Sequence, residues 1–106
     1  MANQLDREEI RKIAEQYVRL IKSDMKVQKA YLYGSAVSGT FTKDSDIDIA
    51  IVADDFTGDF IEDLLKLMKL RRLIDIRIEP HPFKPDDFEP DDPFVAEIIN
   101  TGIEIM

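Results

Sequence analysis

The sequence predicts a single α/β domain that spans residues 1–106, with helices packed on a small mixed β-sheet. Two short segments, 46–52 and 74–79, alternate between isoleucine and other residues, as half-buried strands do. Between these segments, and near the start of the chain, apolar residues recur at helical spacing. These observations give the element order α-β-α-β-α-β-α(-β). The two alternating strands are joined through a helix and are therefore expected to be parallel neighbours.

The first third of the chain is predicted to form a helix, a strand and a tight turn. Apolar residues spaced three and four apart over residues 7–24 predict an amphipathic helix. Residues 29–33 are predicted to form a short strand, which Gly34 ends. Ser35 follows at a position where its hydroxyl can cap a short helical turn. This glycine–serine pair is therefore expected to join a strand to a helix.

The two alternating strands place acidic residues on one face. In the strand 46–52, three isoleucines point to one side of the sheet, while Asp46 and Asp48 point to the other. The strand 74–79 repeats this pattern, and Asp75 lies on its polar face. If the two strands are neighbours, their acidic residues share one side of the sheet.

Turn-forming residues bound the remaining elements. Apolar residues from Phe60 to about Arg72 predict the helix between the two alternating strands. All five prolines lie within residues 80–93, which indicates an ordered connector. A last helix, 93–100, begins with a proline at its first position, and residues 103–106 are expected to add a terminal strand.

The composition disfavours several classes of protein. The chain carries 14 basic and 22 acidic residues and a formal net charge of −8, which disfavours binding to a nucleic-acid backbone. No apolar run reaches the ~20 residues of a membrane span, and the polar N-terminus lacks the apolar core of a signal peptide. The absence of cysteine excludes disulfides and thiolate metal sites. We therefore expect a cytoplasmic protein with neither a membrane nor a nucleic acid as partner.

Asp46 and Asp48 are the first candidates for a functional site. Residues two apart on a strand project from the same face, roughly 6.5–7 Å apart at their Cα atoms, which allows two carboxylates to share a metal ion. If the strand of Asp75 lies beside theirs, that residue adds a third carboxylate about 5 Å across the sheet. Clustered carboxylates raise one another's pKa unless a cation is present. Oxygen ligands of this kind suit Mg²⁺, with Mn²⁺ as an alternative.

Gly34 and Ser35 offer a complementary site for an anion. A glycine allows the backbone to approach a ligand closely, and a serine at the start of a helix offers its hydroxyl and free amides to a phosphate. Phosphate binding on one side and metal binding on the other are the requirements of a nucleotidyl transfer with two metal ions. In such a reaction one ion activates the attacking hydroxyl, and the other stabilises the leaving pyrophosphate.

Gly34-Ser35, followed after ten residues by Asp46-x-Asp48, resembles the signature of the DNA polymerase β-like nucleotidyltransferase superfamily. The small size is similar to that of its minimal nucleotidyltransferases (MNT proteins), and the match covers nearly the whole chain. The resemblance implies a nucleotidyltransferase fold, contact of Ser35 with the triphosphate of ATP, and two Mg²⁺ ions held by Asp46 and Asp48. It also implies that Asp75 is a third catalytic acid, which helps to bind metal and to deprotonate the acceptor hydroxyl.

The resemblance further implies a reaction and a partner. Minimal members resemble the antitoxins of HEPN–MNT toxin–antitoxin pairs, which implies transfer of AMP from ATP to a tyrosine of a HEPN ribonuclease. Two other hypotheses stay open. The chain could neutralise its partner by contact alone, or the acceptor could be a small-molecule hydroxyl whose pocket a partner subunit completes. The base preference and the choice between homo- and hetero-oligomers are also left open.

The acidic residues also have simpler interpretations. The run Asp44-x-Asp46-x-Asp48 is similar to the start of a calcium loop, but that loop needs a glycine and a glutamate where this chain has Ile49 and Asp55. The aspartate pair is also compatible with the solvated face of an edge strand, and Asp44 with a surface loop.

Residues outside the motif have less specific patterns. Arg77 is expected to form an ion pair with a neighbouring acid rather than to contact phosphate. For Lys43, a contact with the triphosphate and a solvated side chain both stay open, and His81 is expected to be structural. The phenylalanines of the proline-rich connector suit local packing, although their acidic neighbours make the connector the preferred partner surface. A solvated face or a docking patch is expected from the basic residues near the end of the second long helix, which are Lys66, Lys69, Arg71 and Arg72.

Overall fold

The computed structural model describes residues 7–39, 42 and 44–106, which form four strands and four α-helices. The strands are β1 (Val27–Tyr33), β2 (Ile47–Ala53), β3 (Ile78–Phe83) and β4 (Ile103–Glu104). The helices are α1 (Arg7–Lys22), α2 (Ser35–Ser38), α3 (Phe60–Arg71) and α4 (Pro93–Thr101), and a 3₁₀ turn covers Pro85–Asp87. Their order along the chain confirms the predicted mixed α/β fold class.

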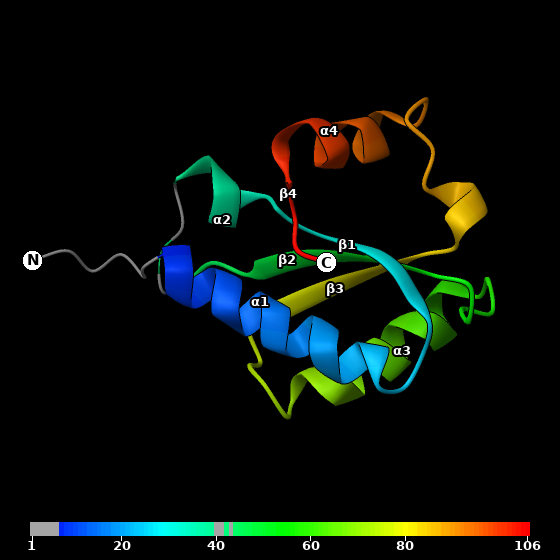
Figure 1. Cartoon of the computed structure of the whole chain (residues 1–106), viewed down its shortest axis with the longest axis horizontal. Helices are drawn as coiled ribbons and strands as arrows, with labels where there is room; N and C mark the ends of the chain where they lie inside the picture. The colour runs from blue at the N-terminus through cyan, green and yellow to red at the C-terminus, as the bar shows by residue number, and fades with distance from the viewer. Residues whose placement is uncertain (1–6, 40–41, 43) are drawn as a thin grey trace, which may run out of the picture.

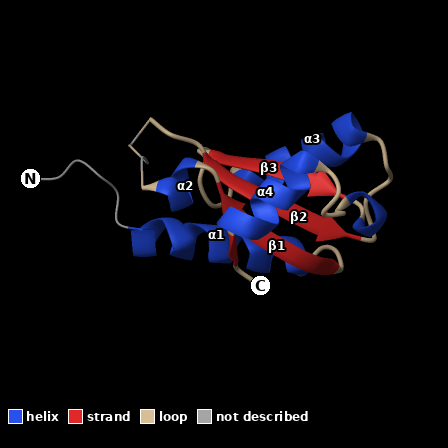
Figure 2. Cartoon of the chain, turned by 90° about the horizontal axis from the view of Figure 1, so that it is seen from above, coloured by secondary structure: helices blue, strands red, loops and turns tan. Residues whose placement is uncertain are grey.

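The strands form one mixed sheet in the order β3-β2-β1-β4 (Figure 1). β1 is antiparallel to β2 and to β4, while β2 and β3 run parallel, as predicted for two strands joined through a helix. α1 and α3 cover one face of the sheet and α4 lies over the other, an arrangement that Figure 2 shows from above. Within the described ranges, no helix is long and apolar enough to cross a membrane.

The face of the sheet toward α1 and α3 carries the larger core. The isoleucines of β2 predicted to share one face, Ile47, Ile49 and Ile51, are fully buried on this side. They pack in one cluster with Tyr17 of α1 and Leu67 of α3. The Tyr17 hydroxyl donates a hydrogen bond of 2.6 Å to the Leu67 carbonyl, so a buried polar contact also joins the two helices.

The face toward α4 carries a smaller, more aromatic core. Ala50 and Val52 of β2 form its floor, and Phe83 and Phe88 pack against them with only 9% and 8% of their surface exposed. Local packing, one of the two interpretations of the connector phenylalanines, is therefore confirmed for these two residues. Phe94, at the start of α4, is 41% exposed.

The third strand begins four residues later than predicted. Residues 74–79 were expected to form it, but the strand covers Ile78–Phe83. Before it, the chain makes successive turns, in which Asp75 N–H donates to Arg71 O at 2.8 Å. Two prolines lie inside the strand, which is possible because β3 is an edge strand and needs ladder hydrogen bonds on one side only. The first part of the predicted connector is therefore strand.

The buried bond between α1 and α3 predicts a measurable contribution to stability. Tyr17→Phe removes the donor to the Leu67 carbonyl, so we expect the free energy of unfolding to fall by about 1–2 kcal/mol. In a domain of this size, each kcal/mol of lost stability lowers Tm by roughly 4–8 °C. Thermal and denaturant melts followed by circular dichroism measure both quantities.

The matched control is Tyr31→Phe, on the other face of the sheet. The Tyr31 ring is 8% exposed, and its hydroxyl makes no hydrogen bond within the described residues. This variant should melt close to the wild type, and equal losses in the two variants would contradict the assignment.

Candidate active site

A glycine turn joins β1 to α2 and lies against an acidic residue of β2. Gly34 has a φ of +76°, in the left-handed region that glycine adopts without a steric penalty. A Cβ atom at this position would overlap the carboxylate of Asp48. Both the backbone conformation and the close approach therefore require glycine here. Gly34 is also the N-cap of α2, so the predicted cap at Ser35 is wrong, and Ser35 is instead the first residue of the helix.

Asp48 lies in the middle of a row of polar side chains that crosses three strands. In the ladder it is paired with Tyr33 of β1 and with Glu79 of β3. Because its neighbours Ile47 and Ile49 face α1 and α3, the Asp48 side chain lies on the α4 face. Asp46 precedes the first residue of β2 and is exposed, whereas Asp48 is half-buried.

Negative charge gathers around Asp48. Its pKa is raised to about 6, because burial disfavours the ionised carboxylate and because Asp46 and Glu79 add negative charge nearby. The pKa of Tyr33 is raised to about 12 by burial, with smaller contributions from Asp48 and Glu79. A cation at this point of the sheet would relieve the repulsion between the acids.

The donor set fits a magnesium ion held jointly with a phosphate-bearing substrate. No group of three histidine or acidic side chains within residues 7–39, 42 and 44–106 is positioned to hold a metal ion alone. Glu79 instead accepts a hydrogen bond of 3.2 Å from Arg71 Nη1, which also donates to Ile78 O at 2.8 Å. Asp46 and Asp48 remain as the candidate oxygen ligands. Mg²⁺ is commonly bound by one or two carboxylates together with substrate phosphates.

Asp75 does not lie on β3, and its predicted place beside Asp48 is wrong. It lies in the turn between α3 and β3, where its carboxylate accepts three hydrogen bonds from Arg77. The donors are the Arg77 backbone N–H at 2.8 Å, Nε at 3.0 Å and Nη2 at 2.7 Å. These bonds lower the pKa of Asp75. Because the strand starts after this turn, the acid opposite Asp48 is Glu79, while the ion pair expected of Arg77 is confirmed.

A comparison with protein families identifies the chain. The family described as Polymerase beta, Nucleotidyltransferase matches residues 8–106. The chain belongs to this family. The match confirms the resemblance to nucleotidyltransferases that the sequence indicated. The comparison with curated proteins gives no match.

Three solved structures share the fold of this nucleotidyltransferase domain. A structure from Sulfolobus solfataricus, assigned as a nucleotidyltransferase, has a TM-score of 0.65 at 18% identity and covers 92% of this chain and 80% of its own. A toxin–antitoxin structure with AMP-PNP has a TM-score of 0.60 at 24% identity, and the match covers 87% of this chain and 72% of that structure's chain. A mutant of the toxin–antitoxin MntA–HpeT has a TM-score of 0.51 at 21% identity, and the match covers 96% of this chain and 73% of that structure's chain. At these identities the likeness shows the fold.

His81 lies on the same face of the nucleotidyltransferase sheet as Asp48, but its surroundings are aromatic. Its ring centroid is 4.5 Å from that of Phe83, 5.2 Å from Phe94 and 5.3 Å from Phe60. Burial lowers the pKa of His81, so the imidazole is neutral at pH 7. These contacts agree with the structural role expected from the sequence. Lys43 lies outside the described residues.

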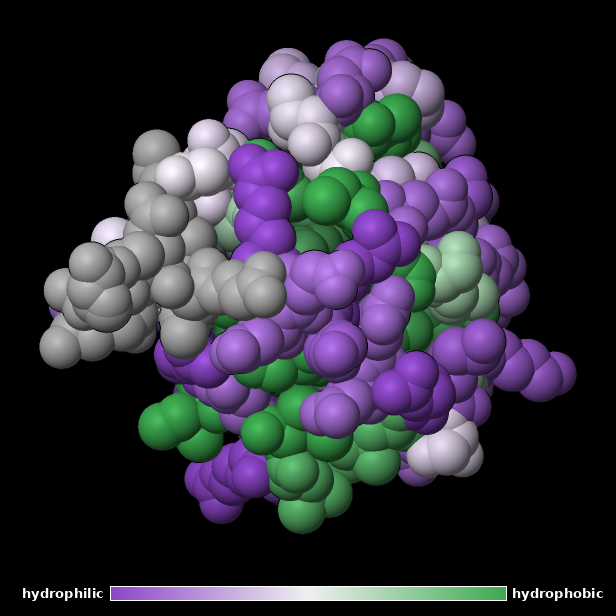
Figure 3. Space-filling view, turned by 60° about the vertical axis from the view of Figure 1, so that its left-hand side comes forward, coloured by the Kyte–Doolittle hydropathy of each residue, from purple (hydrophilic) through white to green (hydrophobic). Residues whose placement is uncertain are grey.

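The surface around α2 is mixed in character. Figure 3 shows this side of the domain, where hydrophilic residues form a band across the middle and apolar side chains gather above and below it. The apolar area at the lower edge lies at the height where Figure 1 shows the turn between α3 and β3. Apolar side chains are therefore exposed on this side of the domain.

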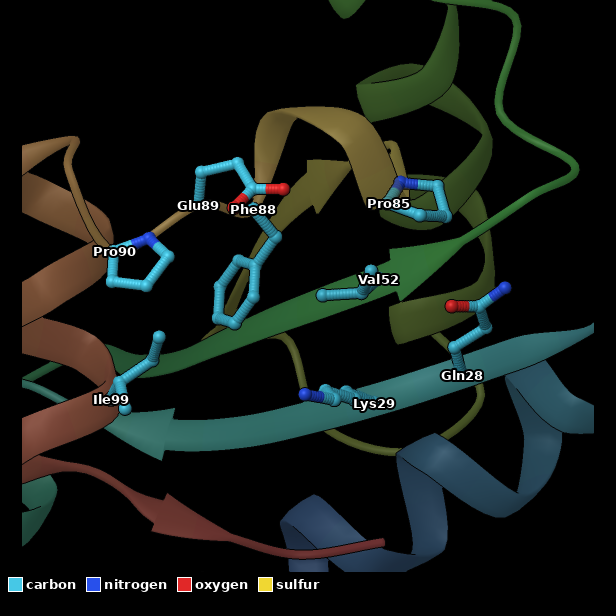
Figure 4. A pocket seen from close by; sticks show the side chains of 8 residues that line it. All are labelled: Gln28, Lys29, Val52, Pro85, Phe88, Glu89, Pro90 and Ile99. Atoms are coloured by element: carbon cyan, nitrogen blue, oxygen red, sulfur yellow. The ribbon is translucent and has the colours of Figure 1, made fainter.

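A separate cavity of about 330 Å³ lies on the α4 side of the sheet (Figure 4). Its lining includes Lys29 of β1, Val52 of β2, Phe88 of the connector and Ile99 of α4. Val52 is four residues beyond Asp48, which is about 13 Å along a strand. The cavity is therefore at the other end of β2 and is not part of the candidate active site.

The raised pKa of Asp48 predicts a pH-dependent stability for the nucleotidyltransferase domain. A carboxyl group whose pKa is about 6 in the folded chain and 3.8 in the unfolded chain stabilises the fold at low pH. That contribution is lost as the pH rises through about 6, because ionisation costs more in the folded state. Asp48→Asn removes this ionisation. Its gain in Tm over the wild type, without Mg²⁺ or nucleotide, should be larger at about pH 7.5 than at about pH 5.

An exposed aspartate outside the candidate site provides the control. Asp91 is exposed in the connector before α4. Asp91→Asn should shift Tm by the same small amount at both pH values. A gain for Asp48→Asn that does not change with pH would contradict the crowding of negative charge.

The contact between Gly34 and Asp48 predicts a difference between two glycine substitutions. Gly34 and Gly58 both have positive φ, +76° and +95°, so alanine pays a conformational cost at either position. At Gly58 the new Cβ would meet Lys84 Cδ at 3.7 Å and no other atom of the described residues within 4 Å, whereas at Gly34 it would overlap the Asp48 carboxylate. Gly34→Ala should therefore lower the free energy of unfolding by about 1–3 kcal/mol more than Gly58→Ala, measured by chemical denaturation.

A double-mutant cycle separates this overlap from backbone strain. Because Asp48→Ala removes the carboxylate, Gly34→Ala should cost less in that background than in the wild type. Strict additivity of the two substitutions is the result that would exclude the contact.

Proposed function

We propose that this domain transfers AMP from ATP to a hydroxyl group of a protein partner, with Mg²⁺ as its metal. One observation carries the proposal. The Gly34 turn and the Asp48 carboxylate meet across β1 and β2, so a backbone suited to phosphate lies beside acids suited to a metal. Membership of the nucleotidyltransferase family supports nucleotidyl transfer as the reaction.

Each residue of the site has a proposed role. Gly34 and Ser35 contact the triphosphate, and Asp46 and Asp48 hold the metal. Glu79 takes the place of the third acid that the sequence assigned to Asp75, because it lies opposite Asp48 in the ladder. Mg²⁺, when bound, would neutralise charge on the triphosphate and favour the ionised form of the acceptor hydroxyl.

The proposed reaction balances without a further reactant. The oxygen of the acceptor hydroxyl forms a bond to the α-phosphorus of ATP. The bond from that phosphorus to the oxygen bridging the α- and β-phosphates breaks, and pyrophosphate leaves with the electron pair. The hydroxyl proton passes to the Glu79 carboxylate, which Arg71 holds from the edge of the sheet.

The proposed acceptor is a tyrosine of a HEPN ribonuclease toxin. Two of the structures that share the fold are toxin–antitoxin structures, and one of them was solved with AMP-PNP. In the other, two aspartates that lie two positions apart were replaced by glutamate. The net charge of −8 also suits a basic partner such as a nucleic-acid-cleaving protein.

Neutralisation of the partner by contact alone is the second candidate function. The observation that favours it is the engagement of Glu79 by Arg71, which leaves Asp46 and Asp48 without a third grouped acid within the described ranges. In that case the partner is inhibited without any covalent change.

A labelling experiment tests the proposed transfer. The chain is incubated with Mg²⁺, ATP radiolabelled at the α-phosphate, and the protein encoded by the adjacent gene. We expect label on that protein with the wild type and none with Asp46→Asn/Asp48→Asn. Glu79→Gln should lower kcat by about 10²–10⁴-fold, as for loss of a general base, while Asp75→Asn should keep kcat close to the wild-type value.

The same assay distinguishes the alternatives. A loss of kcat in Asp75→Asn that equals the loss in Glu79→Gln would contradict the reassignment of the third acid. Label that persists in the double aspartate variant rules out the proposed site. Inhibition of the partner without any label supports neutralisation by contact.

A further inference from the structure

The turn between α3 and β3 presents two large aliphatic side chains to solvent. Leu73 and Ile76 are 70% and 72% exposed, more than any other large hydrophobic side chain of the described residues. Their neighbour Ile74, by contrast, packs against the larger core. Apolar side chains gathered on a polar surface commonly mark a site of interaction with another protein. Leu73 and Ile76 are therefore a candidate site of contact with another protein.

The turn is held rigidly by its own polar residues. Asp75 lies between the two aliphatic residues in the sequence, and its carboxylate accepts three hydrogen bonds of 2.7–3.0 Å from Arg77. Asp75 N–H donates to Arg71 O at 2.8 Å, and Ile78 N–H donates to Asp75 O at 3.2 Å. The exposed pair is therefore presented on a braced turn, and its presentation costs little conformational entropy on binding.

A backbone hydrogen bond fixes this turn next to the candidate active site. Ile47 N–H donates to Arg77 O at 2.8 Å, and Ile47 lies between Asp46 and Asp48. The turn that carries the aliphatic pair is thus anchored at the acidic end of β2. A protein that rested on the turn would have its surface beside the carboxylates.

The charges beside the pair indicate what kind of surface fits it. Lys69 and Arg72, at the end of α3, are exposed and form no ion pair with other residues of the described ranges. Arg71 and Arg77, in contrast, are engaged by Glu79 and Asp75. On a chain with a net charge of −8, this corner is locally basic. A complementary surface has an apolar centre and an acidic rim.

We propose that Leu73 and Ile76, flanked by Lys69 and Arg72, form the docking surface for the protein that carries the acceptor hydroxyl. This inference rests on the proposed function, because it assigns the occupant as the protein that receives AMP. The contacting part of that protein has apolar side chains bordered by acidic ones. Docking there brings the acceptor surface to the metal-binding end of β2.

Binding measurements with matched variants test the docking surface. The probe is the protein encoded by the adjacent gene, and its Kd is measured by calorimetry. Leu73→Ser/Ile76→Ser should raise the Kd at least about tenfold, as for loss of a central apolar contact. Lys69→Glu/Arg72→Glu should also raise it, and more strongly at low salt. The control Ile61→Ser/Leu65→Ser removes side chains that are 62% and 58% exposed elsewhere on α3, and should leave the Kd unchanged.

A second measurement separates this inference from the proposed function. The rise in Tm caused by Mg²⁺ and AMP-PNP reports the nucleotide site alone, and it should be the same in the docking variants as in the wild type. If the wild type binds the partner without labelling it, and Leu73→Ser/Ile76→Ser loses binding, the docking surface stands while AMP transfer fails. If labelling occurs but this variant binds and labels like the wild type, the docking surface is overturned while AMP transfer stands.

Three further results would overturn the docking surface. One is an equal loss of binding in the control Ile61→Ser/Leu65→Ser. Another is no binding of the partner by the wild type. The third is a dimer of this chain in analytical ultracentrifugation that Leu73→Ser/Ile76→Ser dissociates, which would assign the aliphatic pair to a second copy.

Discussion

The close approach of the Gly34 backbone to the Asp48 carboxylate constrains the rest of the site. The antiparallel register of β1 and β2 places Tyr33 opposite Asp48, and the next residue must turn out of the sheet without a side chain. Gly34 does so with a positive φ and opens α2 directly. The strand register, the turn and the position of the acid therefore depend on one another. A change in any of them would separate the Gly34 turn from the Asp48 carboxylate.

The half-buried acid lowers the stability of the fold, and apolar burial on the opposite face of the sheet offsets this loss. Asp48 is half-buried near other acids, and burial together with the charges of Asp46 and Glu79 raises its pKa to about 6, so ionisation of this carboxyl group destabilises the fold. The residues on either side of it in the strand, Ile47 and Ile49, are fully buried against α1 and α3. Each such side chain contributes about 1.5–3 kcal/mol by its burial. Strand alternation thus allows one element to carry both the core and the acidic row.

The sequence predicted the regular elements well and one strand boundary poorly, for identifiable reasons. The strict alternation of β2 and the helical spacing of α3 are local patterns, and both elements formed within a residue or two of their predicted bounds. The isoleucines from Ile74 to Ile78 also alternate, but there the chain makes successive turns after α3. Prolines argued against a strand beyond residue 79, yet an edge strand tolerates them. The alternation of Glu79, His81 and Phe83 on one face was the signal that could have located the strand. The contact between Gly34 and Asp48 depends on register across two strands, so no local pattern could reveal it.

Arg71 lies at the edge of the acidic row and pairs with one of its members, Glu79. Its Nη1 donates both to Ile78 O, at 2.8 Å, and to the Glu79 carboxylate, at 3.2 Å, so the last residue of α3 is joined to the first residues of the edge strand. The guanidinium offsets part of the negative charge at the end of the row, whereas Asp46 and Asp48 form no ion pair within the described residues. A basic side chain in this row would offset the negative charge that favours binding of a metal ion. Neither described ladder partner of Asp48, Tyr33 or Glu79, is basic, so the negative charge of the row is available to a cationic ligand. One arginine at the edge of the sheet therefore pairs with Glu79, and the proposed metal and phosphate sites lie at the centre of the row.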